Sequence, residues 1–94
     1  MSEVCLEGWL IVPLERLATV RTGLAQHVRL TREEPGCLSF DVREDLARPG
    51  YFRVEERFVS QAAFEAHQTR AAQTEWAEIT KGLARDYTIT GLPE

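Results

Sequence analysis

Four segments of the chain have the length and side-chain pattern of β-strands, with alternating residues on opposite faces. In the second segment the apolar residues lie on one face and the polar residues on the other. The first segment is apolar on both faces, which is typical of a strand covered on both sides. The predicted strands run from Val4 to Val12, Cys37 to Glu44, Tyr51 to Val59 and Asp86 to Leu92.

The segment from Leu14 to Thr31 has apolar residues at helical spacing, which predicts an amphipathic helix. Arg21 falls within the apolar stripe, where its stem can pack while its charged head stays in water. The turn sequence EEPG at 33–36 is expected to end this helix. The stripe consists of Leu14, Leu17, Arg21, Leu24, Ala25 and Val28.

A second helix is predicted to begin after Ser60, whose hydroxyl is a good N-cap. Helical spacing continues to about Ala84, with a break expected between Thr69 and Thr74. The order β-α-β-β-α-β is typical of a ferredoxin-like α+β fold, a four-stranded antiparallel sheet with helices on one face. Residues 1–94 are interpreted as a single domain.

The open face of such a sheet is expected to pair with a second copy of the chain. So small a domain buries little apolar surface by itself, and its first strand is apolar on both sides. Trp9 and Glu55 are predicted to lie on this dimer side. The charged residues of the predicted hairpin that share its polar face are interpreted as interface or solvent charges; they are Asp41, Arg43, Arg53 and Arg57.

Charge and composition argue against several classes of partner. The formal net charge is −4, and the basic residues are scattered, which disfavours nucleic acid. The longest apolar stretch, Trp9 to Val12, is far too short to span a membrane. The first residues lack the pattern of a signal peptide, so we expect a cytoplasmic protein in which Cys5 and Cys37 are free thiols. No metal-ligand spacing and no cofactor motif is present, so neither a metal nor a cofactor is predicted.

Three segments resemble the antibiotic biosynthesis monooxygenase family. EPGCLSF at 34–40 is similar to the start of that family's second strand, and PGYFRVEERF at 49–58 to its hairpin. SQAAFEAH at 60–67 is similar to the beginning of its second helix. The three occur in order, and the resemblance runs from about Val4 to Leu92.

This resemblance implies a dimer whose two sheets pack into an α+β barrel, with a pocket between helices and sheet in each subunit. The family's activities include cofactor-free oxygenation of phenols or quinols, quinol oxidation, haem degradation and isomerisation of small phosphorylated sugars. The haem-degrading members need an axial histidine where this chain has Trp76 and Ala77, which disfavours haem degradation. Fold alone does not select among the remaining activities.

His67 is the leading candidate for a catalytic residue. It shares a helical face with Phe64 and Ala71, and that face is predicted to look toward the sheet. A histidine there can act as the general base that removes a proton from a phenol. The alternative is a hydrogen-bonded core or rim histidine.

Glu56 is the second candidate, because it lies on the apolar face of its predicted strand. A carboxylate in that position must be paired or hydrogen-bonded. It is expected either to orient His67 or bind substrate, or to form a structural ion pair with a nearby arginine.

Aromatic residues are candidates for the walls of a pocket that takes a flat aromatic substrate. Phe40, Phe64 and Trp76 are predicted to line it, with ordinary core packing as the alternative. Tyr51 is expected to hydrogen-bond a substrate oxygen or to be an exposed hairpin residue. His27 is predicted to be a surface or rim residue, with a position at the pocket mouth as the alternative.

The leading functional hypothesis is a cofactor-independent monooxygenase or oxidase of a small phenolic, quinol or anthrone-like compound. An isomerase or decarboxylase using the same base is an alternative, which two arginine heads in the cavity would favour. A non-catalytic module that binds a small ligand is the other alternative. A filled pocket, with His67 packed and bonded to backbone, would favour that reading.

Overall fold

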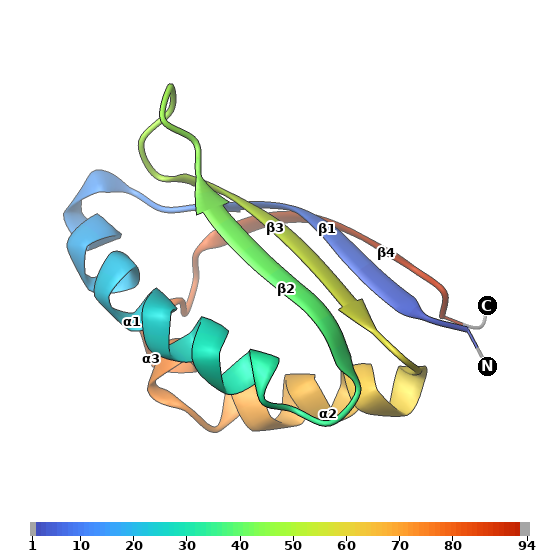
Figure 1. Cartoon of the computed structure of the whole chain (residues 1–94). Helices are drawn as coiled ribbons and strands as arrows, with labels where there is room; N and C mark the ends of the chain where they lie inside the picture. The colour runs from blue at the N-terminus through green and yellow to red at the C-terminus, as the bar shows by residue number, and fades with distance from the viewer. Residues whose placement is uncertain (1, 93–94) are drawn as a thin grey trace.

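The computed structural model describes residues 2–92, which form one four-stranded sheet with its helices on a single face (Figure 1). The strand order is β2-β3-β1-β4 and every neighbouring pair is antiparallel. This confirms the predicted ferredoxin-like α+β architecture. The strands are β1 (Val4–Ile11), β2 (Cys37–Glu44), β3 (Tyr51–Phe58) and β4 (Ala84–Thr90); the helices are α1 (Leu14–Arg32), α2 (Gln61–Ala72) and α3 (Glu75–Ile79).

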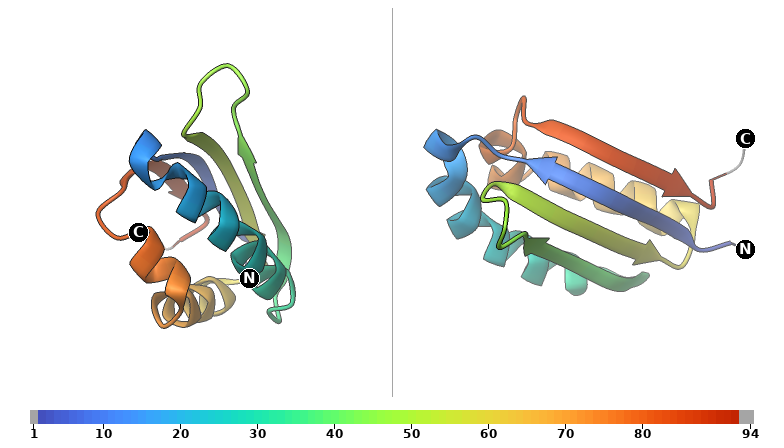
Figure 2. Two further views of the ribbon diagram at one scale, coloured as in Figure 1. Left: turned by 90° about the vertical axis from the view of Figure 1, so that its left-hand side faces the viewer. Right: turned by 90° about the horizontal axis from the view of Figure 1, so that it is seen from above.

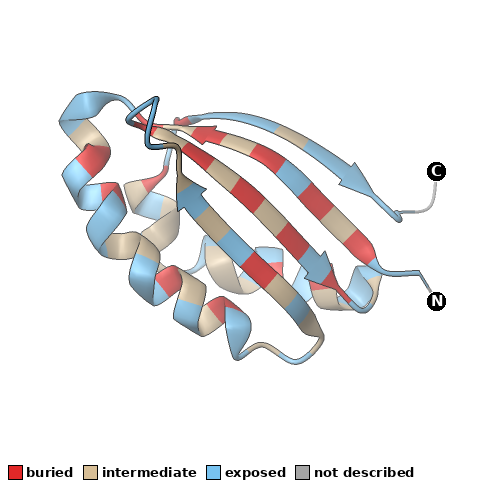
Figure 3. Cartoon of the chain, turned by 45° about the horizontal axis from the view of Figure 1, so that its top comes forward, coloured by how far each residue is buried: buried red, intermediate tan, exposed pale blue. Residues whose placement is uncertain are grey.

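The core lies between the sheet and the helices. Buried residues alternate with more exposed ones along β1 and β3 (Figure 3), since successive strand side chains point to opposite faces. In the right-hand view of Figure 2 the four strands lie in front of the helices, so residues 2–92 leave the second sheet face uncovered. The buried apolar core includes Val4, Leu6, Leu10, Val20, Phe52, Val54, Phe58 and Phe64.

The buried face of α1 differs from the predicted stripe. It is formed by Leu17, Val20, His27 and Thr31. Leu14 is 73% exposed in the first helical turn, and Arg21 lies out in solvent, where it forms a two-bonded ion pair with Glu44. The apolar pattern therefore predicted the helix correctly but missed two polar residues on its inner face.

The second helical region begins where Ser60 caps it, because the Ser60 hydroxyl accepts a hydrogen bond from the backbone N–H of Ala63 at 3.2 Å. The predicted break is confirmed, since α2 ends at Ala72 and α3 begins at Glu75. The prediction that helix continues to Ala84 is wrong. A turn that includes Gly82, with φ of +78°, ends the helical region early, and β4 already begins at Ala84.

The turn between α1 and β2 brings Glu34 close to α2. Gly36 has φ of +88°, and a Cβ at this position would lie 2.7 Å from the Cβ of Ala63. Glycine is therefore required here both for its backbone conformation and for the close approach of the turn to α2. The sheet is irregular directly after this turn, between Cys37 and Ser39, and Leu38, an apolar residue of the predicted second strand, is exposed.

The open face of the sheet carries an aromatic and arginine cluster, formed by Trp9, Arg48, Tyr51 and Arg53. The Trp9 and Tyr51 rings meet edge to face at 6.3 Å. The guanidinium of Arg48 lies 4.8 Å from the Trp9 ring centre and 4.3 Å from that of Tyr51. Around this cluster the face is charged, with exposed pairs such as Arg53–Glu7 and Arg43–Glu55.

Within residues 2–92, no helix has both the length and the apolar character required to cross a membrane.

Candidate active site

A cavity of about 320 Å³ opens between β1, β3 and β4 on one side and the helices on the other. Its walls combine apolar side chains with several convergent polar groups, as in small-molecule sites. The lining residues are Leu6, His27, Glu56, His67, Gln68, Ala71, Ala72, Trp76, Ala77, Thr80, Arg85, Tyr87 and Ile89.

His67 projects from α2 into the layer between helices and sheet, as its helical face predicted. It is only 4% exposed, and its ring stacks on Phe58 of β3 at 5.0 Å. The side chain is bonded to a carboxylate: its Nδ1 lies 2.9 Å from Oε1 of Glu34.

Glu34 binds two side chains of α2 at once, one through each carboxylate oxygen. Arg70 donates from Nε to Glu34 Oε2 at 2.6 Å, while Oε1 faces His67. Arg70 also donates to the hydroxyl of Thr31, at 2.9 Å, which ties α2 to the end of α1. An arginine-paired carboxylate is a hydrogen-bond acceptor, so the proton of a neutral His67 resides on Nδ1 and the lone pair on Nε2.

Glu56 faces the free side of the His67 ring. Its Oε1 lies 3.9 Å from His67 Nε2 and has no hydrogen-bond partner among the described residues. The expectation of an arginine ion pair is therefore not met, because every ion pair recorded for Glu56 in residues 2–92 is with His67. A buried carboxyl without a cationic partner is unusual and points to a use for it.

Burial acts on the two groups in opposite directions. It raises the pKa of Glu56 to about 7, and the carboxylate of Glu34 reinforces this shift. Burial lowers the pKa of His67 below its ordinary 6.5, although Glu34 partly offsets the shift. Near neutral pH the pair therefore contains a neutral imidazole beside a carboxyl group that is close to its own titration point.

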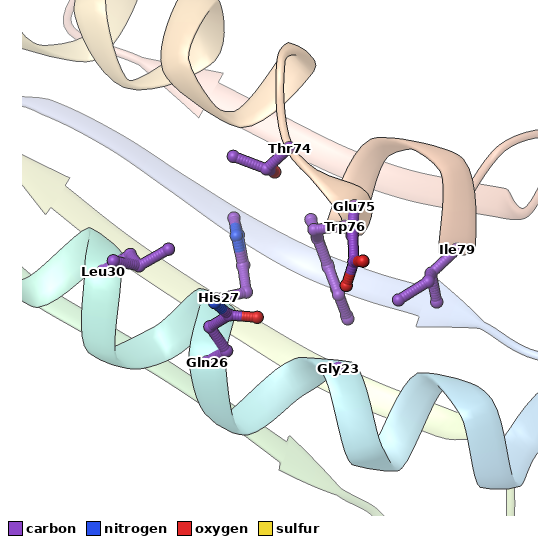
Figure 4. A pocket seen from close by; sticks show the side chains of 8 residues that line it. All are labelled: Gly23, Gln26, His27, Leu30, Thr74, Glu75, Trp76 and Ile79. Atoms are coloured by element: carbon purple, nitrogen blue, oxygen red, sulfur yellow. The ribbon is translucent and has the colours of Figure 1, made fainter.

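His27 is not a rim residue; the prediction is wrong. It is 6% exposed and lies on the inner face of α1, where its ring stacks on Trp76 at 4.7 Å and nearly parallel. Figure 4 shows the two rings side by side, His27 from α1 and Trp76 from α3. They separate the main cavity from a smaller one of about 100 Å³ between these helices.

The predicted wall residues are only partly brought together. Trp76 lines the main cavity, whereas Phe40 borders a separate, smaller cavity of about 50 Å³ that His27 and Glu56 also line. Phe64 packs against Phe58 in the core and does not line the cavity. Tyr51 is on the opposite face of the sheet, so it cannot contact a ligand in the cavity.

The comparisons with known proteins agree with this fold and its length. The model of the antibiotic biosynthesis monooxygenase family matches residues 10–79. The chain belongs to this family. No curated protein sequence matches the chain.

Among solved structures, a candidate antibiotic biosynthesis monooxygenase from Deinococcus radiodurans is 27% identical, with a TM-score of 0.73 over 97% of this chain and 93% of its own. One from Nitrosomonas europaea is 17% identical, with a TM-score of 0.82 over 95% and 88%. Rv0793 from Mycobacterium tuberculosis is 20% identical, with a TM-score of 0.77 over 99% and 97%. At these identities the last two show the fold alone.

Glu34 is the site residue that the sequence reasoning missed. In this antibiotic biosynthesis monooxygenase domain it is the first residue of the EPGCLSF segment, which was interpreted as the start of a strand. A charged residue directly before Pro-Gly is most simply explained by turn formation. Glu34 could have been identified because it belongs to a segment that resembles the family, but its residue type alone does not point to a site.

Replacing Glu56 tests the raised pKa of its carboxyl group. Between about pH 4.5 and pH 7 the unfolded chain loses this proton while the folded chain keeps it, so Glu56 costs stability as the pH rises. We therefore expect the free energy of unfolding of Glu56→Gln, relative to that of the wild type, to rise by up to about 3 kcal/mol between pH 4 and pH 8. The slope is about 1.4 kcal/mol per pH unit. Urea unfolding at several pH values measures this difference.

The control is Glu55→Gln, one position away on the other face of β3. An equal rise in that variant, or no rise in Glu56→Gln, would mean that the Glu56 carboxyl titrates at its ordinary pKa.

Proposed function

We propose that the protein is a cofactor-independent monooxygenase or oxidase of a small hydroxyaromatic compound, such as a quinol, phenol or anthrone. The observation that carries the proposal is a buried His67 whose Nδ1 is held by Glu34, leaving Nε2 toward the cavity and 3.9 Å from Glu56. A base that faces the cavity, with a carboxyl group beside it, is suited to the deprotonation of a phenol.

In this mechanism His67 Nε2 removes the proton of the substrate hydroxyl, and the carboxylate of Glu56, 3.9 Å from Nε2, receives it through one water or after a small approach of the two side chains. The electron-rich anion then transfers an electron to dioxygen, which is the oxidant. When a ring CH₂ becomes a carbonyl, one oxygen atom enters the product and the other leaves as water with the two hydrogens. When a quinol is only oxidised, its two hydrogens leave with dioxygen as hydrogen peroxide.

The two alternative functions have less support. An isomerase of a polar, anionic substrate would need several basic groups, but Arg85 is the one arginine among the described residues that line the cavity. A purely binding module was expected to show a filled pocket and a His67 bonded to backbone. The cavity instead has room for a small ring, and His67 is bonded to a carboxylate.

Oxygen consumption tests this proposal. Purified protein treated with a chelator is mixed with a panel of quinols, monophenols and anthrones, and dioxygen uptake is followed together with the product spectrum. We expect uptake above the rate of spontaneous oxidation for at least one of these classes. A protein that binds these compounds in the cavity but never raises the rate would contradict the oxidation and favour the binding module.

The same proposal includes a homodimer formed through the open sheet face. The cluster of Trp9, Arg48, Tyr51 and Arg53 supports it, since half-buried aromatics flanked by arginines are enriched at interfaces. Sedimentation equilibrium is expected to give twice the mass of the chain. Trp9→Glu is expected to weaken association at least tenfold while Trp9→Phe keeps it. A wild type that sediments as a monomer would contradict the dimer.

A further inference from the structure

His27 is a buried polar side chain with no recorded partner. Its Nδ1 is wholly buried and makes no hydrogen bond among the described residues. The ring is fixed by its neighbours, because Trp76 stacks on it at 4.7 Å and Phe40 meets it edge to face at 5.4 Å. A buried imidazole that is held in place by packing but makes no hydrogen bond calls for an explanation in terms of function.

The position of its proton follows from burial. Burial and the nearby His67 and Arg70 lower the pKa of His27 to about 3, so the ring is neutral at any physiological pH and has one N–H. A buried N–H without a partner is rarer in proteins than an unpaired acceptor. The proton is therefore assigned to Nε2, and the unpaired Nδ1 is the acceptor.

The two histidines of the cavity then have opposite hydrogen-bonding characters. His67 presents a lone pair on Nε2, because its Nδ1–H is bound to Glu34. His27 presents an N–H. Their ring centres are 5.8 Å apart and both line the same cavity. At N···O distances of about 2.9 Å, one oxygen atom can contact a nitrogen of each ring.

We propose that His27 donates its Nε2–H to the same substrate oxygen that His67 deprotonates, and so stabilises the oxyanion that forms there. This inference rests on the proposed function and adds a second catalytic residue to it. A donor aimed at developing charge in a dry site is among the most effective catalytic devices.

The pairing also restricts the substrate class. The donor is neutral and shares the cavity with the carboxyl group of Glu56, and Arg85 is the one arginine among the described lining residues, so the cavity offers a permanently charged carboxylate a single cationic partner. It fits a neutral aromatic hydroxyl that becomes negative only within the site. The parallel pair of Trp76 and His27 holds the donor in a fixed plane.

Binding of 4-nitrophenol tests this directly, because its neutral and ionised forms have different absorption spectra. We expect the wild type to bind it as the phenolate at a pH where the free compound is mostly protonated. His27→Phe is expected to lower the bound phenolate fraction and the affinity about tenfold or more, whereas His27→Gln, which retains an N–H donor, restores most of both. Gln26→Ala, on the same helix, serves as the control.

Nitrogen NMR of the wild type gives a second readout that needs no variant. The expected spectra show His27 protonated on Nε2 and His67 on Nδ1, with both signals shifting when 4-nitrophenol is added. A His27 proton on Nδ1, equal phenolate binding in His27→Phe, or no binding to the wild type would overturn the inference. Binding of phenolate that depends on His27, without oxygen uptake from any quinol, would support His27 and contradict the proposed oxidation instead.

Discussion

His67→Gln is expected to lower kcat/KM for oxidation of a hydroxyaromatic substrate by about 10²- to 10⁴-fold, the usual contribution of a general base. Glutamine can fill much of the imidazole's volume and can still bond to Glu34, but it offers no basic nitrogen to the cavity. The loss should appear mainly in kcat, because the base acts on the proton that moves in the transition state. Oxygen consumption under saturating and limiting substrate gives the two constants separately.

The matched control is Glu65→Gln, an exposed position on the same helix. It changes a side chain of α2 without touching the cavity, so its kcat should stay within a factor of two of the wild type. Circular dichroism and thermal unfolding of both variants check that α2 remains folded. A His67→Gln enzyme with unchanged kcat would remove His67 from the mechanism and leave Glu56 as the base.

Glu34→Gln is expected to lower the free energy of unfolding by about 2–3 kcal/mol. The carboxylate holds both Arg70 and His67, and its side chain is only 15% exposed. An amide in its place can bond to one of the two donors but turns its own N–H₂ toward the other. Arg70 is then left partly buried without its counter-charge. Urea unfolding at neutral pH measures this loss.

The control for this loss of stability is Glu44→Gln. Glu44 binds one arginine through both carboxylate oxygens, whereas Glu34 divides its oxygens between Arg70 and His67. The partner of Glu44, Arg21, is 53% exposed. An exposed pair contributes about 0–1 kcal/mol, so this variant should lose far less. Equal losses in the two variants would mean that the Glu34 pair gains nothing from its burial.

Much of the fold followed from local patterns because strands and helices have fixed periods. Strand β1, apolar on both faces, and the cap at Ser60 each depend on a few neighbouring residues. Helix α3 ends before the predicted Ala84, for a reason that the apolar periodicity does not contain. The turn there includes Gly82, and an isolated glycine within a helical stretch does not by itself predict a helix end.

The site was harder to predict, because its residues come together from three helices and the sheet. His67 and Glu56 were found because each is a polar residue on an otherwise apolar face. His27 failed the same test: the apolar stripe of α1 was placed on the wrong residues, so its polar inner face was not seen. The Glu34 bond to His67 joins residues 33 positions apart, which no local pattern records.

The proposed oxidation depends on one step, the deprotonation of a substrate hydroxyl by His67 within the cavity between helices and sheet. The most direct test is a crystal structure of the protein with a bound quinol, prepared without oxygen so that no turnover occurs. We expect a ring oxygen to lie about 2.6–3.2 Å from His67 Nε2, with the ring in the cavity that Trp76 lines. A quinol bound elsewhere, or one whose oxygens both lie far from His67 Nε2, would contradict it.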